Sequence, residues 1–116
     1  MKNNTFRILL LAMLAIITSS FSNPKQSKIT YKVKSTHWGI KLTYSNEQGN
    51  TNQEDVNDSK WEKTFTAQSG TFLYISAQSE MHNANIKVEI LKDGRVIETS
   101  ESKGDFVIAT ASTYLR

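Results

Sequence analysis

Apolar and polar residues alternate with a period of two along most of the chain after residue 28. The stretch ITYKVKS (residues 29–35) places its apolar residues on one face and its lysines on the other, and NIKVEILK (residues 85–92) repeats the pattern. A side-chain period of two is typical of a strand with one buried face. The residues predicted to point inward in these two strands are Ile29, Tyr31, Val33, Ile86, Val88 and Ile90.

A third alternating stretch, WGIKLTYS (residues 38–45), follows the first through the tripeptide His-Trp-Gly at 37–39. This connection is compatible with either a tight hairpin or a bend within one long strand. Residues 46–59 break the alternation, and Gly49 with the following asparagine is a turn signal. We expect a turn, a short edge strand and a surface loop in this segment.

The richest aromatic stretch is WEKTFTAQSGTFLYISAQ, residues 61–78. In its first half the aromatic residues occupy odd-numbered positions and the even-numbered positions are polar, which predicts a strand with one face exposed to solvent. The Ser-Gly pair at 69–70 predicts a turn. The second half is apolar on both parities, which is usual for a central, well-covered strand. We therefore predict a hairpin whose core residues include Trp61, Phe65, Phe72 and Tyr74.

The strongest turn signal is Asp93-Gly94, which lies between two alternating runs. Glycine tolerates positive φ, so this dipeptide predicts a two-residue type I′ hairpin turn. A further turn is expected at residues 102–105, and FVIATASTYL (106–115) completes the pattern. Residues 29–116 are therefore predicted to form an all-β domain, a seven- to eight-stranded antiparallel β-sandwich that is immunoglobulin-like or a flattened barrel.

The first 22 residues have a different composition from the rest of the chain. Lys2 and Arg7 precede ten uninterrupted apolar residues at 8–17, and small polar residues follow. This order is typical of a cleaved secretory signal peptide over residues 1–22, with residues 23–28 as a short linker. An uncleaved N-terminal membrane anchor is the alternative, although a spanning helix needs about 20 apolar residues. Either interpretation predicts an extracytoplasmic location: periplasmic, cell-envelope or secreted.

The charge balance gives no sign of a nucleic-acid-binding surface. The chain has 14 basic and 11 acidic residues, a net charge of +3, and 12 against 11 remain without Lys2 and Arg7. Nucleic-acid-binding domains concentrate basic residues on one face, whereas here they are scattered along the sequence. Contact with a membrane is expected only through the N-terminal segment, if that segment is not cleaved. The absence of cysteine excludes disulfides, thiol catalysis and cysteine-bound metals.

Four sequence blocks, taken in order, are similar to one known family. They are ITYKV (29–33), IKLTYSNEQGNTNQEDV (40–56), WEKTFTAQSGTFLYISAQ (61–78) and IKVEILKDGRVIETSESKGDFVIATAS (86–112). Together they resemble the extracytoplasmic domain of the MmpS family. The resemblance implies a short N-terminal anchor, a small β-sandwich, and an accessory role beside RND-type exporters that move lipids or siderophores. The chain departs from the family in lacking the cysteine pair that many members carry, and in its short apolar run.

No motif for catalysis or metal binding is present in the sequence. The two histidines, His37 and His82, lack the spacing of HExxH or HxH ligands, and no GxSxG serine motif occurs. The carboxylates clustered at residues 54–58 lack the closing glutamate of an EF-hand loop. We therefore expect a non-enzymatic protein without a cofactor or a metal.

Aromatic or amphipathic side chains at strand ends remain as candidates for a binding surface. Trp38, Met81 and His82 lie at predicted strand ends or loops, where they could contact a ligand or a partner. For Trp38, however, the alternation of residues 38–45 favours a position in the core, on the same face as Ile40 and Leu42. These features favour an envelope or transporter accessory protein, with an RND-type exporter or another envelope protein as partner. A freely secreted or periplasmic binding module for a small apolar or sugar ligand is the alternative.

Overall fold

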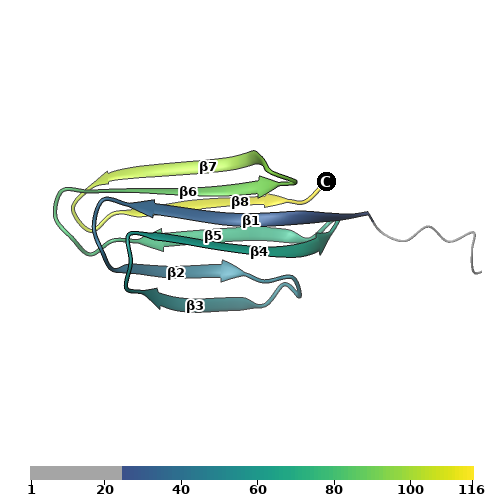
Figure 1. Ribbon diagram of the computed structural model, residues 1–116, viewed down its shortest axis with the longest axis horizontal. Helices are drawn as coiled ribbons and strands as arrows, with labels where there is room; N and C mark the ends of the chain where they lie inside the picture. The colour runs from purple at the N-terminus through teal and green to yellow at the C-terminus, as the bar shows by residue number, and fades with distance from the viewer. Residues whose placement is uncertain (1–24) are drawn as a thin grey trace, which may run out of the picture.

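The computed structural model describes residues 25–116, which form eight antiparallel strands with no helix in that part of the chain (Figure 1). The predicted all-β sandwich is thus confirmed, at the upper end of the predicted strand number. The strands are β1 (Gln26–Ser35), β2 (Ile40–Ser45), β3 (Thr51–Val56), β4 (Lys60–Gln68), β5 (Phe72–Gln78), β6 (Ala84–Lys92), β7 (Arg95–Gly104) and β8 (Ile108–Tyr114).

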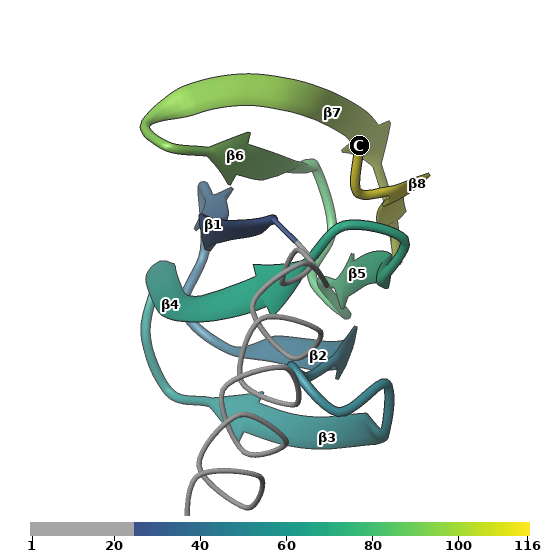
Figure 2. The ribbon, with the colours of Figure 1, turned by 90° about the vertical axis from the view of Figure 1, so that its right-hand side faces the viewer.

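The strands pair in two separate four-stranded sheets, so the domain is a sandwich and not a flattened barrel. One sheet has the order β4-β1-β6-β7 and the other the order β3-β2-β5-β8. Figure 2 shows the two sheets facing each other along the length of the strands. Among the described residues, β2–β3 and β6–β7 are the only consecutive strands that pair. All other connections pass from one sheet to the other, including residues 36–39, for which we predicted a hairpin or a bend.

The core lies between the sheets and is built from the inward parity of the strands. In β1 and β6 this parity is the predicted one, and its six residues are at most 1 % exposed. Burying each such side chain contributes on the order of 1.5–3 kcal/mol. The fully enclosed large residues are Tyr31, Ile29, Ile40, Leu42, Leu73, Ile75, Ile86, Ile90, Val33 and Val88.

Tyr31 carries a hydroxyl group across the core from β1 to the opposite sheet. The hydroxyl donates to the carbonyl oxygen of Ser45 at 3.0 Å and lies 3.0 Å from Ser45 Oγ. It also accepts a hydrogen bond from the backbone N–H of Tyr74 at 3.2 Å. Ser45 Oγ in turn donates to the carbonyl oxygen of Phe72 at 3.1 Å. One side chain therefore links three strands of the two sheets.

The predicted hairpin over residues 61–78 is wrong, because β4 and β5 belong to different sheets. The Ser-Gly turn connects the two sheets instead. The N–H of Ser69 donates a hydrogen bond to the carbonyl of Lys25 at 2.8 Å, and the N–H of Gly70 donates to the carbonyl of Leu115 at 2.7 Å. Because β4 is an edge strand, Trp61 and Phe65 are half-buried and pack against the core from one side. The ring of Trp61 lies 5.0 Å from that of Tyr44 in the other sheet.

The two-sided apolar strand β5 is central, as predicted, but two of its predicted core residues face outward. Leu73, Ile75 and Ala77 are the enclosed residues of this strand. Phe72 is 43 % exposed and Tyr74 is half-buried, so their prediction as core residues is wrong. The reason is that only one face of each sheet is covered in a two-layer sandwich. The aromatic parity of β5 therefore forms part of an outer surface.

The turn between β6 and β7 has the predicted form. Asp93 and Gly94 have φ values of 49° and 85°, and Lys92 pairs with Arg95 across them. Positive φ at both central residues is what a type I′ turn requires. The pairing shifts between Ile90 and Leu91, where a bulge bends β7.

The N-terminal predictions lie mostly outside the described residues. The expected signal peptide or anchor, residues 1–22, is not among them. The expected linker over 23–28 overlaps the first strand, because β1 already begins at Gln26. Residues 25–116 contain no helix of the length and apolar character that crossing a membrane requires.

Candidate functional site

One end of the sandwich carries several exposed apolar side chains, among them Trp38 and Met81, which were predicted from the sequence as interaction residues. We call it the distal end, formed by the connections 36–39, 57–59, 79–83 and 105–107; it lies opposite the end where β1 begins (Figure 1). Trp38 is 68 % exposed, Phe106 is 57 % exposed, and Met81 is also exposed. β1 has ten residues, so about 30 Å separates the two ends.

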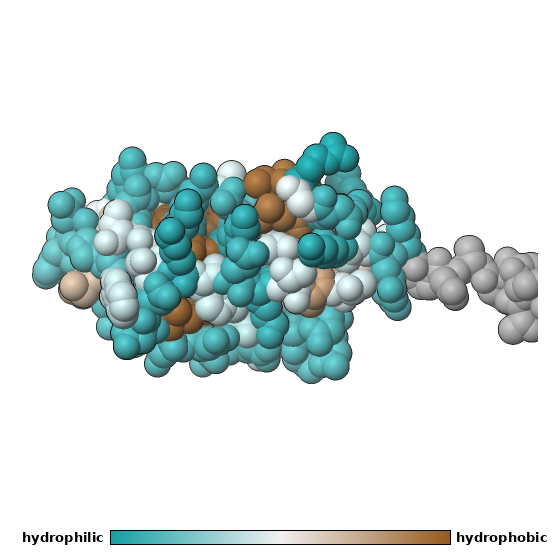
Figure 3. Space-filling view, viewed as in Figure 1, coloured by the Kyte–Doolittle hydropathy of each residue, from teal (hydrophilic) through white to brown (hydrophobic). Residues whose placement is uncertain are grey.

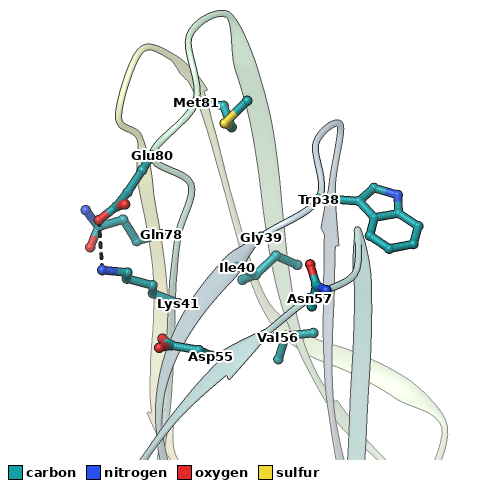
Figure 4. Close-up of a pocket in the computed structure, with 10 residues that line it drawn as sticks. All are labelled: Trp38, Gly39, Ile40, Lys41, Asp55, Val56, Asn57, Gln78, Glu80 and Met81. Atoms are coloured by element: carbon teal, nitrogen blue, oxygen red, sulfur yellow. Dashed lines mark ion pairs between the residues drawn. The ribbon is translucent and has the colours of Figure 1, made fainter.

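A pocket of about 290 Å³ opens at the distal end, beside β2, β3 and β5 (Figure 4). Ile40 and Val56 lie in its centre, and Figure 4 shows Trp38 on one side and the Lys41–Glu80 pair on the other. Pockets that enclose a drug-sized ligand span about 300–1,000 Å³. The volume lies just below this range, which suits one anchoring side chain of a partner or a small ligand.

The polar rim of this pocket contains an ion pair. Lys41 Nζ lies 2.9 Å from Glu80 Oε1, and both side chains are largely exposed. The hydrogen bond to Glu80, with the charges of Glu80 and Asp55, raises the pKa of Lys41 above its usual 10.5. An exposed pair of this kind contributes little stability, so its main effect is to fix charge positions beside the apolar floor.

Phe106 is held in an unfavourable backbone conformation that presents its ring to solvent. Its φ is 53°, a region that residues other than glycine and asparagine rarely adopt. Its backbone N–H donates to the carbonyl of Met81 at 3.2 Å, and its ring lies edge-on to His82 with centroids 5.2 Å apart. Strained residues of this kind cluster at functional sites, which supports a binding role for this loop pair.

Asp105 ties the two loops beside Phe106 together. Its carboxylate accepts the backbone N–H of Asn83 at 2.7 Å, and its other oxygen lies 3.4 Å from His82 Nδ1. The hydrogen bond from Asn83, followed by that from His82, lowers the pKa of Asp105 below its usual 3.8.

We expect the Asp105 carboxyl to titrate below pH 3.8 in an NMR titration of its side-chain carbon. Because the folded pKa is the lower one, the stability that this contact contributes is present above pH 3.8 and is lost as the pH falls through the folded value. His82→Ala should move the midpoint upward but leave it depressed, since the Asn83 bond remains. A wild-type midpoint at or above 3.8 would contradict this loop geometry.

The structure places all three predicted interaction residues, Trp38, Met81 and His82, at the distal end. The core position favoured for Trp38 is wrong, because its strand begins only at Ile40, after Gly39 with a φ of 95°. Phe106 was missed, since FVIATASTYL reads as one strand. The preceding Gly104-Asp105 pair is a turn signal that could have placed it in a loop.

No group of three or more His, Asp or Glu side chains within residues 25–116 is arranged to hold a metal ion. His37 and His82 lie in different loops, and each has its own partner. His37 Nδ1 lies 3.0 Å from Thr36 Oγ1, while His82 contacts Asp105.

Comparison with known proteins adds no family assignment: no protein-family model matches the chain, and no curated protein is significantly similar to it. The function is therefore argued from the geometry of the molecule together with the features of its sequence.

Proposed function

We propose that this chain is a non-enzymatic, extracytoplasmic accessory protein that binds another envelope protein through its distal end. The observation that carries the proposal is the gathering of Trp38, Met81 and Phe106, all exposed, on one end of the sandwich. Aromatic residues and methionine are enriched at protein interfaces, where they fill pockets and exclude water. Exposed apolar side chains that cluster on one surface often mark an interaction site.

The rim chemistry fits a protein partner. The apolar floor at Ile40 and Val56 would take an anchoring side chain, while Lys41 and Glu80 offer one charge of each sign beside it. The resemblance of the sequence to the MmpS family suggests an RND-type exporter as the partner. A small apolar or sugar ligand in the same pocket is the alternative, which the volume of about 290 Å³ also permits.

Site-specific photo-crosslinking in the native host tests this proposal. A photoreactive residue in place of Trp38 should crosslink to an RND-type exporter or another envelope protein, identified by mass spectrometry. The same residue in place of Thr110, which is exposed on the outer face of β8, should not. Crosslinking at both positions alike, or at neither, would contradict a specific distal interface.

With the partner identified, Trp38→Ala should weaken binding about 30-fold or more, because truncating a central interface tryptophan costs 2 kcal/mol or more. Thr110→Ala is the matched control and should leave the affinity unchanged. If Trp38→Ala binds the protein partner normally but a sugar or apolar ligand quenches Trp38 fluorescence, the binding-module alternative is favoured.

A further inference from the structure

The opposite end of the sandwich brings together the start of β1, three turns and the end of the chain. We call it the proximal end, residues 25–28, 46–50, 69–71, 92–96 and 115–116. Backbone hydrogen bonds join Ser69 to Lys25, Gly70 to Leu115 and Asp93 to Lys28 at 2.7–2.8 Å. Lys92 Nζ also donates to the carbonyl of Arg116 at 2.6 Å. The chain therefore enters the domain at the centre of this end, which faces the viewer in Figure 2.

Charge is distributed unequally between the two ends. The proximal end carries five basic side chains, Lys25, Lys28, Lys92, Arg95 and Arg116, against the two carboxylates of Glu47 and Asp93. The connections of the distal end carry three carboxylates, those of Asp58, Glu80 and Asp105. The adjoining strand residues include Lys34, Lys41, Lys60 and Lys103, and Lys41 is paired with Glu80, so charges of both signs occur at this end. The near-neutral total charge of the domain thus hides an excess of basic side chains at the proximal end.

Exposed aromatic side chains border the basic end. Phe72, Tyr74 and Tyr114 lie on the outer face of the second sheet, where Phe72 and Tyr114 are paired across β5 and β8. The ring of Phe72 lies 5.1 Å from that of Tyr114 and 6.4 Å from that of Tyr74, and Tyr114 is 67 % exposed. We call these three residues the aromatic margin.

A second apolar group at this end belongs to the first sheet. Val96 and Ile97 of β7 are exposed and line a hollow of about 390 Å³ together with Lys25, Lys92 and Arg95. Figure 3 shows hydrophobic surface over the β7 side of the molecule toward this end. Apolar and basic side chains are therefore interleaved around the point where β1 begins.

We propose that the proximal end docks on the surface of a lipid bilayer that contains anionic lipids. Tyrosine and other aromatic residues favour the interface between hydrocarbon and water, where a ring can be buried while a polar tip stays hydrated. Basic side chains are attracted to anionic headgroups, with about 1 kcal/mol for each lysine or arginine near the surface. The proximal end offers both kinds of residue.

The position of the N-terminal segment in the sequence favours a membrane over a soluble acidic partner. The charge-free stretch from Ile8 to Pro24 is joined directly to Lys25, at the centre of the basic end. If residues 1–22 are retained, association of their apolar run, residues 8–17, with a bilayer brings the proximal end to the same surface. Docking would then orient the distal end, with Trp38 and Phe106, away from the membrane.

A single-cysteine fluorescence experiment on the full chain tests the proposal. The chain has no cysteine, so Ser112→Cys and Ile108→Cys each give one labelling site. Both positions are exposed on the outer face of β8, the first beside the aromatic margin and the second at the distal end. Each variant is labelled with an environment-sensitive fluorophore and reconstituted with vesicles of phosphatidylcholine alone or mixed with phosphatidylglycerol.

We expect a blue shift at position 112 that requires phosphatidylglycerol and is reversed by high salt, with no shift at position 108. Phe72→Ser with Tyr114→Ser should abolish the shift, with circular dichroism showing that the fold is retained. Lys25→Gln with Arg95→Gln should weaken docking roughly 30-fold, about fivefold for each charge. The proposal is overturned by no shift at position 112, by equal shifts at both positions, by a shift that ignores lipid charge, or by a shift that survives removal of the aromatic margin.

Discussion

Tyr31→Ala should bring the domain close to unfolding or prevent it from folding. Removing a large aromatic side chain from a packed core typically costs about 3–5 kcal/mol. The side chain of Tyr31 is fully enclosed, and its hydroxyl satisfies Ser45 and Tyr74 in the opposite sheet. Domains of this kind have only about 5–15 kcal/mol of stability in total, and no disulfide supports this one. Urea denaturation followed by fluorescence measures the loss.

Tyr31→Phe separates the hydroxyl from the ring. It should cost about 1–3 kcal/mol, because the core volume is kept while the carbonyl of Ser45 loses a donor. Tyr114→Phe, at an exposed position, is the matched control and should change stability by less than about 0.5 kcal/mol. Equal effects of the two Tyr→Phe substitutions would show that the Tyr31 hydroxyl does not link the sheets.

The stability of the wild-type domain and of Tyr31→Phe should also differ in its dependence on pH. Burial raises the pKa of Tyr31 above its ordinary value of 10.0. The unfolded chain therefore loses this proton first, so the stability that Tyr31 contributes is present below pH 10.0 and declines as the pH rises through the folded value. Tyr31→Phe should remove that part of the alkaline destabilisation.

Ile75→Ala should destabilise the domain by about 2–5 kcal/mol, the usual range for isoleucine to alanine in a core. Ile75 is fully enclosed on β5, with strands paired on both sides and the opposite sheet against its face. The cavity cannot collapse easily there, because the neighbours on every side are strands held in register. A thermal or urea melt of the purified variant measures the loss.

Phe72→Ala on the same strand is the matched control, since Phe72 has the larger side chain but faces outward. It should cost less than about 1.5 kcal/mol, from partial burial against Tyr74 and Tyr114. A larger loss for Phe72→Ala than for Ile75→Ala would mean that the aromatic parity of β5 faces the core after all.

The contrast between these two residues shows where the sequence is informative about the fold. In β1 and β6 one parity is apolar and the other is polar except for Leu91, so alternation alone identifies the face toward the core. In β5 both parities are apolar, and the choice depends on the number of layers, which no local pattern contains. The Ser69-Gly70 turn has the same difficulty, because these residues allow a hairpin and an inter-sheet crossing equally well.

Individual residues of the candidate site could be predicted from the sequence, but the way in which their loops come together could not. Trp38, Met81 and His82 were recognisable as loop residues, but their loops meet only because β1, β5 and β6 all end or begin at the distal end. Phe106 was hidden within an apparent strand. The basic character of the proximal end could not be predicted from the sequence either, because Lys25, Lys92 and Arg116 are far apart along the chain.

β1 lies inside its sheet, and both strands that pair with it, β4 and β6, come much later in the chain. Ile29 pairs with Phe65 and Lys92, so β1 has no hydrogen-bonding partner until much of the chain has been made. Folding dominated by such distant pairings is slow, and an unpaired apolar strand is prone to aggregate meanwhile. Lys28, Lys32 and Lys34 lie on the outward parity of β1, and lysines on an unpaired strand oppose edge-to-edge association. We therefore expect these lysines to oppose aggregation of the chain before β1 is paired, in addition to forming the solvated face of the finished sheet.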